Sequence, residues 1–287
     1  MKIPPGLERH ARSAELPASG VRLFFYDAGS PKSPAALLIH GLGDEADTWR
    51  KVIEPLSSSY HVIAPDLPGF GRSSRPRGRR LTPPYLRAVL FELLDILGIP
   101  SALFAGSSLG AVLAQLCAVR DPRRVSRLVL ADGGLLARGR LSTALVLMLV
   151  PLVGERRYRA LGRDLDAAFA SLFPYYGSFS SLSSQDREFL RVRVGERVRS
   201  DTQRRAYFSF FRSFFLWMFF NARAAGELAA RLPVETLYLW GARDHIIPLA
   251  AGEQALRLHP GARLAVIPAA GHLPHQEAPA EFLRLLS

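Results

Sequence analysis

The stretch Gly106-Ser107-Ser108-Leu109-Gly110 decides the fold. It directly follows a short apolar run at residues 103–105 and opens a stretch, residues 109–120, with helical spacing of its apolar positions. In this setting G-x-S-x-G predicts a sharp turn from strand to helix, which presents the central serine above the edge of a sheet. The Ser108 hydroxyl would then lie near free N–H groups at a helix amino terminus, which stabilise an anion. Ser108 is the predicted nucleophile; its plainer interpretation is a helix N-cap.

Outward from this turn, the chain alternates between apolar runs and helical patterns. We predict strands at residues 21–27, 35–39, 62–64, 103–105, 128–131, 236–240 and 264–268. We predict helices at residues 86–97, 109–120, 249–258 and from residue 279 onward. Continuous apolar runs of this length are typical of strands that are buried on both faces of a parallel sheet. The alternation therefore predicts an α/β fold with a mostly parallel central sheet flanked by helices.

Residues 134–230 interrupt this alternation. They contain no clear strand, and they carry 15 arginines against eight acidic residues. Within them, nine of the 14 residues from 207 to 220 are aromatic. We predict that residues 134–230 form a helical cap inserted into a core made of residues 1–133 and 231–287. The aromatic stretch is expected to pack the cap onto the core; alternatively, it lines an acyl or aromatic pocket, or it contacts lipid.

Two further predicted loops supply partners for the serine, because serine is a weak nucleophile until a base takes its proton. His272 follows the strand predicted at residues 264–268 and is the candidate base. Asp244 follows the strand predicted at residues 236–240 and is the candidate acid that orients the imidazole. Asp132, at the end of the strand predicted at 128–131, is a rival for that acid. We favour Asp244, because it precedes His272 by 28 residues in the order serine, acid, histidine.

A fourth predicted loop, His40-Gly41-Leu42-Gly43, follows the strand at residues 35–39. Its backbone can supply an oxyanion donor, for which we choose the N–H of Leu42 beside that of Leu109. His40 is expected to hold this loop in place, and no chemistry is assigned to His245 or His275.

Five segments together resemble the lid-bearing serine hydrolase branch of the α/β-hydrolase fold superfamily. They are HGLGDEADTW (40–49), DLPGFGRSS (66–74), GSSLG (106–110), WGARDHIIP (240–248) and AGHLPHQEAP (270–279). The resemblance covers the core at about residues 20–133 and 232–287. It implies Ser108, Asp244 and His272 as a catalytic triad and Leu42 and Leu109 as oxyanion donors. It also implies that the protein needs no cofactor and no metal.

The composition of the chain excludes several other classes of protein. The chain has 287 residues, of which 48% are hydrophobic and 22% charged, as in ordinary globular proteins. A single cysteine excludes an intrachain disulfide and a cysteine-based zinc site. The net charge of +12 comes without any nucleic-acid-binding module, so we predict no nucleic-acid partner. The amino terminus lacks the apolar stretch of a secretory signal, and the apolar run at 141–153 is too short to span a bilayer, which predicts a soluble, cytoplasmic protein.

The sequence thus predicts a serine hydrolase that cleaves a small apolar carboxylic ester through an acyl-serine intermediate. Hydrolysis of a carbon–carbon bond, a lactone or an amide, and acyl transfer, remain alternatives on the same triad. A ligand-binding protein without catalysis is a weaker alternative, because all three triad positions are filled. Because the cap is rich in aromatic residues and arginines, peripheral membrane contact through it is a further expectation.

Overall fold

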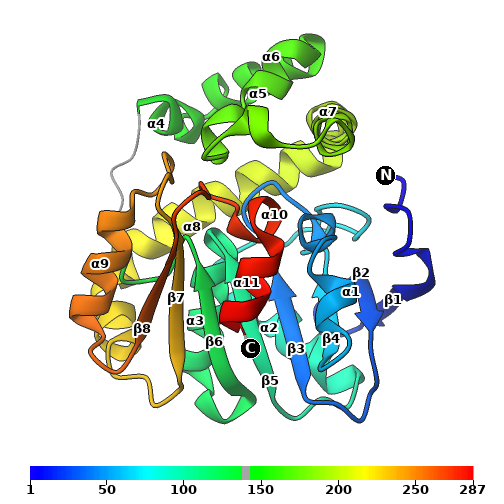
Figure 1. Cartoon of the computed structure of the whole chain (residues 1–287). Coiled ribbons are helices and arrows are strands. Elements are labelled where there is room, and N and C mark those ends of the chain that lie inside the picture. The colour runs from blue at the N-terminus through cyan, green and yellow to red at the C-terminus, as the bar shows by residue number, and fades with distance from the viewer. Residues whose placement is uncertain (138–142, 287) are drawn as a thin grey trace.

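The computed structural model describes residues 1–137 and 143–286. The first residues of the predicted apolar run at 141–153 lie outside this part of the chain. A central sheet is flanked by helices on both faces (Figure 1). Its strands are β1 (Ala11–Leu16), β2 (Val21–Ala28), β3 (Ala35–Ile39), β4 (His61–Pro65), β5 (Ala102–Ser107), β6 (Val125–Ala131), β7 (Thr236–Gly241) and β8 (Arg263–Ile267).

The sheet has the strand order β1-β2-β4-β3-β5-β6-β7-β8. Strands β4, β3, β5, β6, β7 and β8 are parallel, whereas β2 is antiparallel to both β1 and β4. The predicted α/β fold with a mostly parallel sheet is therefore confirmed. Because the parallel strands all end at one edge, the loops that follow β3, β5, β6, β7 and β8 gather there.

The helices that cover the sheet are α1 (Ile53–Leu56), α2 (Pro83–Ile96), α3 (Leu109–Arg120), α9 (Leu249–Leu258), α10 (Pro274–Glu277) and α11 (Pro279–Leu286). Alternate side chains of each strand face opposite layers. Leu37 and Ile39 pack with residues of α2 and α3, whereas Leu38 packs with residues of α1 and α11. Helix α2 begins where Thr82 accepts a hydrogen bond from the Tyr85 N–H at 3.3 Å, and prolines occupy its first turn, where a missing N–H is harmless.

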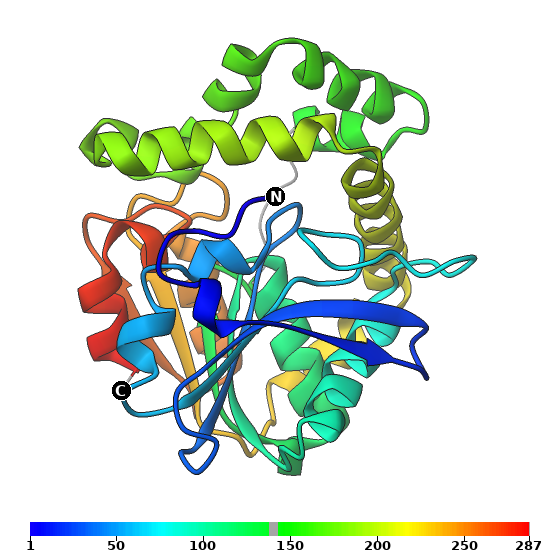
Figure 2. The ribbon, with the colours of Figure 1, turned by 90° about the vertical axis from the view of Figure 1, so that its right-hand side faces the viewer.

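Between β6 and β7 the chain forms α4 (Thr143–Leu149), α5 (Val153–Arg163), α6 (Leu165–Ala170), α7 (Ser184–Arg199) and α8 (Asp201–Ala229). No strand is found in the described part of this segment. Helices α4 to α7 lie above the edge where the parallel strands end, and α8 runs along the core (Figure 1). In Figure 2, the yellow-green helix α7 lies above the blue strands β1 and β2. The boundaries of the helical cap at residues 134 and 230 stay a prediction.

The first half of the aromatic stretch is buried: Phe208, Phe210 and Phe211 are 4%, 0% and 2% exposed. Phe210 is fully buried in the same apolar cluster as α2 and α3, and Phe214 and Trp217 pack against that cluster. Phe219 and Phe220, in contrast, are 82% and 73% exposed. In the described residues no helix combines the length and the hydropathy that crossing a bilayer requires.

One strand of the sheet was not predicted. Strand β1 was not predicted, because its sequence ARSAEL has no apolar run; it is a half-exposed edge strand that pairs with β2. Strand β8, predicted at residues 264–268, is present and forms the opposite edge of the sheet, where its Val266 is 37% exposed. At a sheet edge a strand has one neighbour, and burial no longer dictates an apolar run.

Candidate active site

The turn between β5 and α3 holds Ser108 in a strained backbone conformation. Its φ of 54° and ψ of −117° are rare for a residue with a side chain. The turn can be this sharp because its glycines allow close packing: a Cβ at Gly106 would lie 2.3 Å from the carbonyl of Gly110, and a Cβ at Gly110 would lie 2.2 Å from the Ile39 oxygen. The Ser108 N–H donates to the Ala131 oxygen at 2.8 Å, which fixes the turn to the end of β6. Strain of this kind is typical of functional sites.

Two backbone N–H groups beside the serine, those of Leu42 and Leu109, donate no hydrogen bond within the part of the chain that the structure describes. Leu109 is the first residue of α3, where a helix leaves its N–H groups without internal acceptors. The Leu42 loop is close to the serine, because a Cβ at the preceding Gly41 would lie 4.0 Å from Ser108 Oγ. These N–H groups are available to an oxyanion formed next to Ser108.

The imidazole of His272 is hydrogen-bonded to the carboxylate of Asp244. Nδ1 of His272 lies 2.7 Å from Oδ2 of Asp244, and both side chains are almost fully buried. The other oxygen of Asp244 accepts from the N–H groups of Ile246 and Ile247 at 2.7 and 2.9 Å. These two donors fix the carboxylate, so that its remaining oxygen faces the histidine. A buried carboxylate on Nδ1 holds Nε2 free to accept a proton, as a general base requires.

Asp132, the rival acid, lies beside this pair without a hydrogen bond to the imidazole. Oxygens of Asp132 and Asp244 and a ring nitrogen of His272 all lie within 4.8 Å of one another. Asp132 Oδ1 accepts from the Gly241 N–H at 2.9 Å, and its other oxygen has no partner within the described chain. Burial and the negative charge of Asp244 raise the pKa of Asp132 well above its usual range. The neighbour in contact with the histidine is therefore Asp244.

The same three residues have the donor types of a metal site. However, three of the four carboxylate oxygens already accept hydrogen bonds: both oxygens of Asp244 and Oδ1 of Asp132. A cation that took Asp244 as a ligand would compete with the imidazole and the backbone donors for that carboxylate. The arrangement is that of a hydrogen-bonded acid and base.

The described hydrogen bonds do not include one between Ser108 and His272. Their loops nevertheless follow strands at the same edge, and intervening contacts join them. Ser108 bonds to β6 at Ala131, and Asp132 bonds to the neighbouring strand β7, which leads to Asp244. Catalytic hydrogen bonds are often long before the substrate binds, so this geometry is compatible with a nucleophile and its base.

The His272 loop is clamped against the segment between α6 and α7. One oxygen of Glu277 accepts from the Gly271 N–H at 2.7 Å, and the other accepts from the Gly177 N–H at 2.8 Å. The His272 N–H donates to the Tyr175 oxygen at 2.8 Å, and the Tyr175 ring lies 5.7 Å from the imidazole. Glu277 thus holds the loop of the candidate base and the segment between α6 and α7 together. Sequence reasoning missed this residue, although it lies in a segment quoted for the resemblance.

His40 holds the loop that carries Leu42, as predicted. Its Nδ1 lies 2.8 Å from the Gly41 oxygen, and its Nε2 accepts from the Leu67 N–H at 2.9 Å. Burial lowers the pKa of His40 to about 4, so the imidazole is neutral. His275 is also structural: its Nε2 lies 2.8 Å from Thr48 Oγ1, and its ring packs on Trp49 at 4.2 Å.

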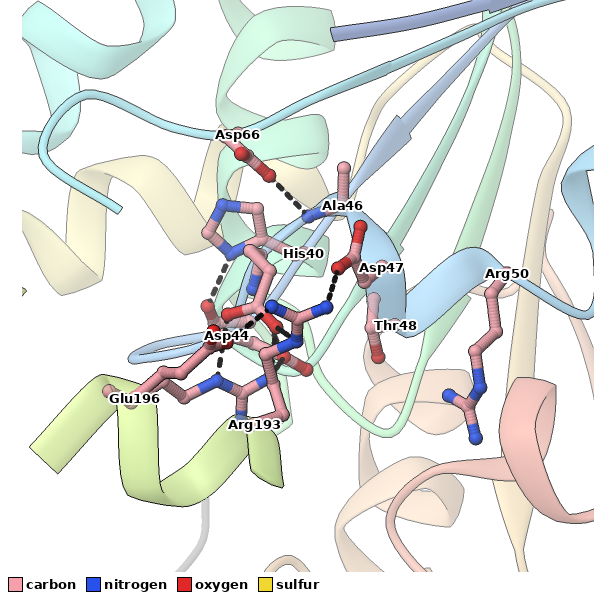
Figure 3. Close-up of polar contacts among 12 residues, drawn as sticks. His40, Asp44, Ala46, Asp47, Thr48, Arg50, Asp66, Arg193 and Glu196 are labelled. Atoms are coloured by element: carbon pink, nitrogen blue, oxygen red, sulfur yellow. Dashed lines mark hydrogen bonds and ion pairs between the residues drawn. The ribbon is translucent and has the colours of Figure 1, made fainter. Parts of the chain in front are cut away.

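A buried cluster of ion pairs joins α7 to residues 44–47, which directly follow the loop that carries Leu42 (Figure 3). Arg193 lies 2.7 Å from Asp47, and Arg197 bonds to Glu45 at 2.6 Å and also contacts Asp44. Glu45 and Asp47 are fully buried, so the arginines compensate charges that water cannot reach. Sequence reasoning missed this cluster. The acidic residues of 44–47 and the arginines of α7 were visible, but nothing in their spacing indicated that they meet.

Comparisons with known proteins agree with this fold. A family model described as the alpha/beta hydrolase fold matches residues 34–279. The 2-hydroxymuconate semialdehyde hydrolase of Pseudomonas sp. (strain CF600) is 30% identical over 285 residues, which cover 95% of this chain and 91% of that protein. Lipase 1 of Psychrobacter immobilis is 26% identical over 271 residues, with 91% and 78% covered. A meta-cleavage product hydrolase of Pseudomonas fluorescens IP01 has a similar structure, with a TM-score of 0.75, 26% identity, and 96% and 95% of the two chains covered.

The fold and the matched family define a hydrolase. The chain belongs to the α/β-hydrolase fold family.

Proposed function

We propose that this protein is a serine hydrolase that cleaves a small apolar carboxylic ester. Ser108 is the nucleophile, His272 the general base and Asp244 the acid that orients it. The observation that carries the proposal is the buried 2.7 Å pair of His272 and Asp244, at the sheet edge that also bears the strained Ser108 turn. The N–H groups of Leu42 and Leu109 beside Ser108 are the kind of donors that acyl transfer needs.

In this proposal Nε2 of His272 takes the Ser108 proton as Oγ attacks the carbonyl carbon. Negative charge then develops on the carbonyl oxygen, and the N–H groups of Leu42 and Leu109 stabilise it. Asp244 stabilises the imidazolium that forms. His272 next gives its proton to the leaving alkoxide, which leaves an acyl group on Ser108. Water that loses a proton to His272 attacks this ester and releases the acid.

Two tyrosines support an apolar substrate. Tyr175 packs beside the imidazole and is 38% exposed, so its ring borders space that a ligand can reach. Tyr207 of α8 lies over the loop of Leu42, because a Cβ at Gly43 would lie 3.1 Å from its ring. Aromatic rings beside the imidazole and over the Leu42 loop favour an apolar acyl or alcohol group over a charged one. In this proposal residues 134–230 act as a cap that closes over the substrate.

Hydrolysis of a carbon–carbon bond is the second candidate. A relative with 30% identity over nearly the whole chain is named a 2-hydroxymuconate semialdehyde hydrolase, and a relative with 26% identity is named a lipase. Both reactions can use the same triad, so they differ in the groups that hold the substrate. A ligand-binding role without catalysis is disfavoured, because the acid and base are paired and the donors beside Ser108 are free. Location in the cytoplasm stays a prediction.

A substrate panel tests the proposal. We expect p-nitrophenyl esters of short fatty acids to be hydrolysed with a higher kcat/KM than lactones, amides or dienol ring-fission products. Ser108→Ala should lose this activity by about 10⁴-fold or more. A fluorophosphonate probe should label wild type and not Ser108→Ala. Wild-type rates from the alanine variant would refute the nucleophile, and ring-fission products at the top of the ranking would replace the ester with a carbon–carbon bond.

A further inference from the structure

We propose that an arginine-lined groove beside α8 binds the phosphate groups of an anionic phospholipid membrane, with exposed aromatic residues of the same helix inserted beside it. The groove is a cavity of about 620 Å³, and its lining includes Arg75, Arg80, Arg159, Arg204, Arg205 and Arg212. It is formed by α5, α8 and the loop between β4 and α2, and this cyan loop lies beside α8 in Figure 2.

Most of this positive charge is uncompensated. Glu155 is the acidic residue in the lining, and it pairs with Arg212 at 2.6 Å. Arg204 pairs with Asp201. Within the described chain, Arg75, Arg80, Arg159 and Arg205 have no acidic partner, and the Nε of Arg75 is buried without a hydrogen-bond acceptor. Guanidinium groups gathered in one groove repel each other, and a phosphate both relieves this repulsion and matches their hydrogen-bonding geometry.

The apolar part of the surface continues from the groove along one face of α8. Arg205, Ser209 and Arg212 are spaced by one helical turn, and the next turns on this face bring Leu216, Phe219 and Phe220. Leu216 is 55% exposed and the two phenylalanines are more exposed still. Because Phe210, Phe214 and Trp217 occupy the opposite face against the core, this outer stripe has no packing role there.

Exposed apolar side chains of the neighbouring turn add to this stripe. The Arg212 guanidinium donates to the oxygens of Leu149 and Val150, which brings the turn between α4 and α5 next to α8. In that turn Val150 is 44% exposed and Leu152 is 72% exposed. Leu152 also has a positive φ of 67°, a conformation that strains a side chain. The surface therefore combines basic groups with apolar residues, as proteins that bind anionic interfaces do.

Charge decides between a membrane and other occupants. A second copy of this chain, docked by a two-fold axis, would place the arginine groove against another arginine groove. A nucleic acid would satisfy the arginines but leave Leu216, Phe219 and Phe220 in water. An anionic bilayer accommodates both parts, because its phosphates lie directly outside its apolar layer.

Vesicle co-sedimentation tests this inference without depending on the proposed function. Vesicles of ether-linked phosphatidylcholine, with or without ether-linked phosphatidylglycerol, contain no carboxylic ester for the enzyme to cleave. We expect wild type to bind the vesicles that contain phosphatidylglycerol, and binding to weaken as salt increases. The double variant Arg159→Gln/Arg205→Gln should bind about 10–30-fold more weakly. Phe219→Ser/Phe220→Ser should lose about tenfold in binding.

The matched control is Arg123→Gln/Arg284→Gln. These arginines are exposed on the core, with 89% and 70% of their side chains accessible, and their loss changes the net charge equally. The control pair should bind as wild type does, and all variants should keep the wild-type melting temperature. Equal losses in the control and groove pairs would overturn the inference, because general charge would then explain binding. So would equal affinity of wild type for both vesicle types, or groove-dependent binding of duplex DNA without vesicle binding.

Discussion

Replacing the acid of the proposed triad should cost less than its position suggests, because a second carboxyl group is within reach. In Asp244→Ala the charge on Nδ1 of His272 is lost. That loss also removes a main reason for the raised pKa of Asp132, so Asp132 ionises more readily. Its oxygen is no more than 4.8 Å from the imidazole nitrogen. Asp132 is therefore expected to take over part of the role of Asp244.

The magnitude follows from the distance. A carboxylate 4.8 Å from an imidazolium contributes about 3.5 kcal/mol at an effective dielectric constant of about 20. This energy corresponds to roughly 300-fold in rate. Loss of a triad aspartate without replacement lowers kcat by about 10⁴-fold. We therefore expect Asp244→Ala to lose only about 30-fold in kcat, and Asp132→Asn/Asp244→Ala to lose about 10⁴-fold.

Asp244→Asn should be worse than Asp244→Ala. The N–H groups of Ile246 and Ile247 fix an oxygen at their side of residue 244, so the new amide nitrogen must face His272. An amide donor there holds the imidazole in the wrong tautomer, and Asp132 cannot correct this. The expected loss is about 10⁴-fold.

Steady-state hydrolysis of a p-nitrophenyl ester measures all four proteins: the three variants above and Asp132→Asn. Asp132→Asn alone should remain within a few-fold of wild type, because a neutral group replaces a carboxyl group whose raised pKa favours its neutral form. A large loss in that single variant would show that Asp132 is the working acid. If Asp244→Ala lost as much as the double variant, Asp132 would not substitute, and the distance argument would be refuted.

Three further variants examine the supports of the site. Gly110→Ala would place a Cβ 2.2 Å from the Ile39 oxygen, so we expect urea unfolding to show a loss of about 1–3 kcal/mol, whereas Gly261→Ala, with open space around it, should be neutral. Glu277→Gln replaces one acceptor of the Gly271 and Gly177 N–H groups by a donor; kcat/KM should fall about 10–100-fold through displacement of the base, and an unchanged value would remove Glu277 from its positioning role. Burial lowers the pKa of His275 from 6.5 to about 3. Between these two pH values the folded state binds fewer protons than the unfolded state, so the protein loses stability as the pH falls. His275→Gln should reduce that slope by up to about 1.4 kcal/mol per pH unit, measured by urea unfolding at several pH values, and an unaltered slope would contradict a neutral buried imidazole.

The sequence predicted the strands in the middle of the sheet because burial on both faces requires continuous apolar runs there. The prediction at residues 35–39 coincides with β3, and the prediction at 128–131 covers the last four residues of β6 (Val125–Ala131). The same reasoning could not find β1, whose pairing with β2 depends on backbone hydrogen bonds and not on apolar side chains. Local patterns therefore predict what the core demands, and they lose information where a strand has one neighbour.

The site was predictable to the extent that its residues follow strand ends. Ser108, Asp244 and His272 were chosen because parallel strands deliver their carboxyl ends to one edge, and the structure brings Asp244 and His272 into contact. Glu277 and the arginines of α7 were not predictable in this way. Their partners are backbone N–H groups or residues about 150 positions away, such as Glu45 for Arg197, and such contacts exist only after the chain has folded.

The buried ion pairs of α7 bear on how the two halves of the site depend on each other. Arg197 binds the loop that carries the Leu42 N–H, while Glu277 joins the His272 loop to the segment that ends at α7. Helix α7 and the segment that precedes it are therefore attached both to the loop of the proposed oxyanion donor and to the loop of the proposed base. Removing one partner of a buried pair leaves the other charge unpaired, which is strongly destabilising. A shift of α7 would be transmitted to both proposed groups, so sequence changes far from Ser108 can alter the proposed chemistry through this helix.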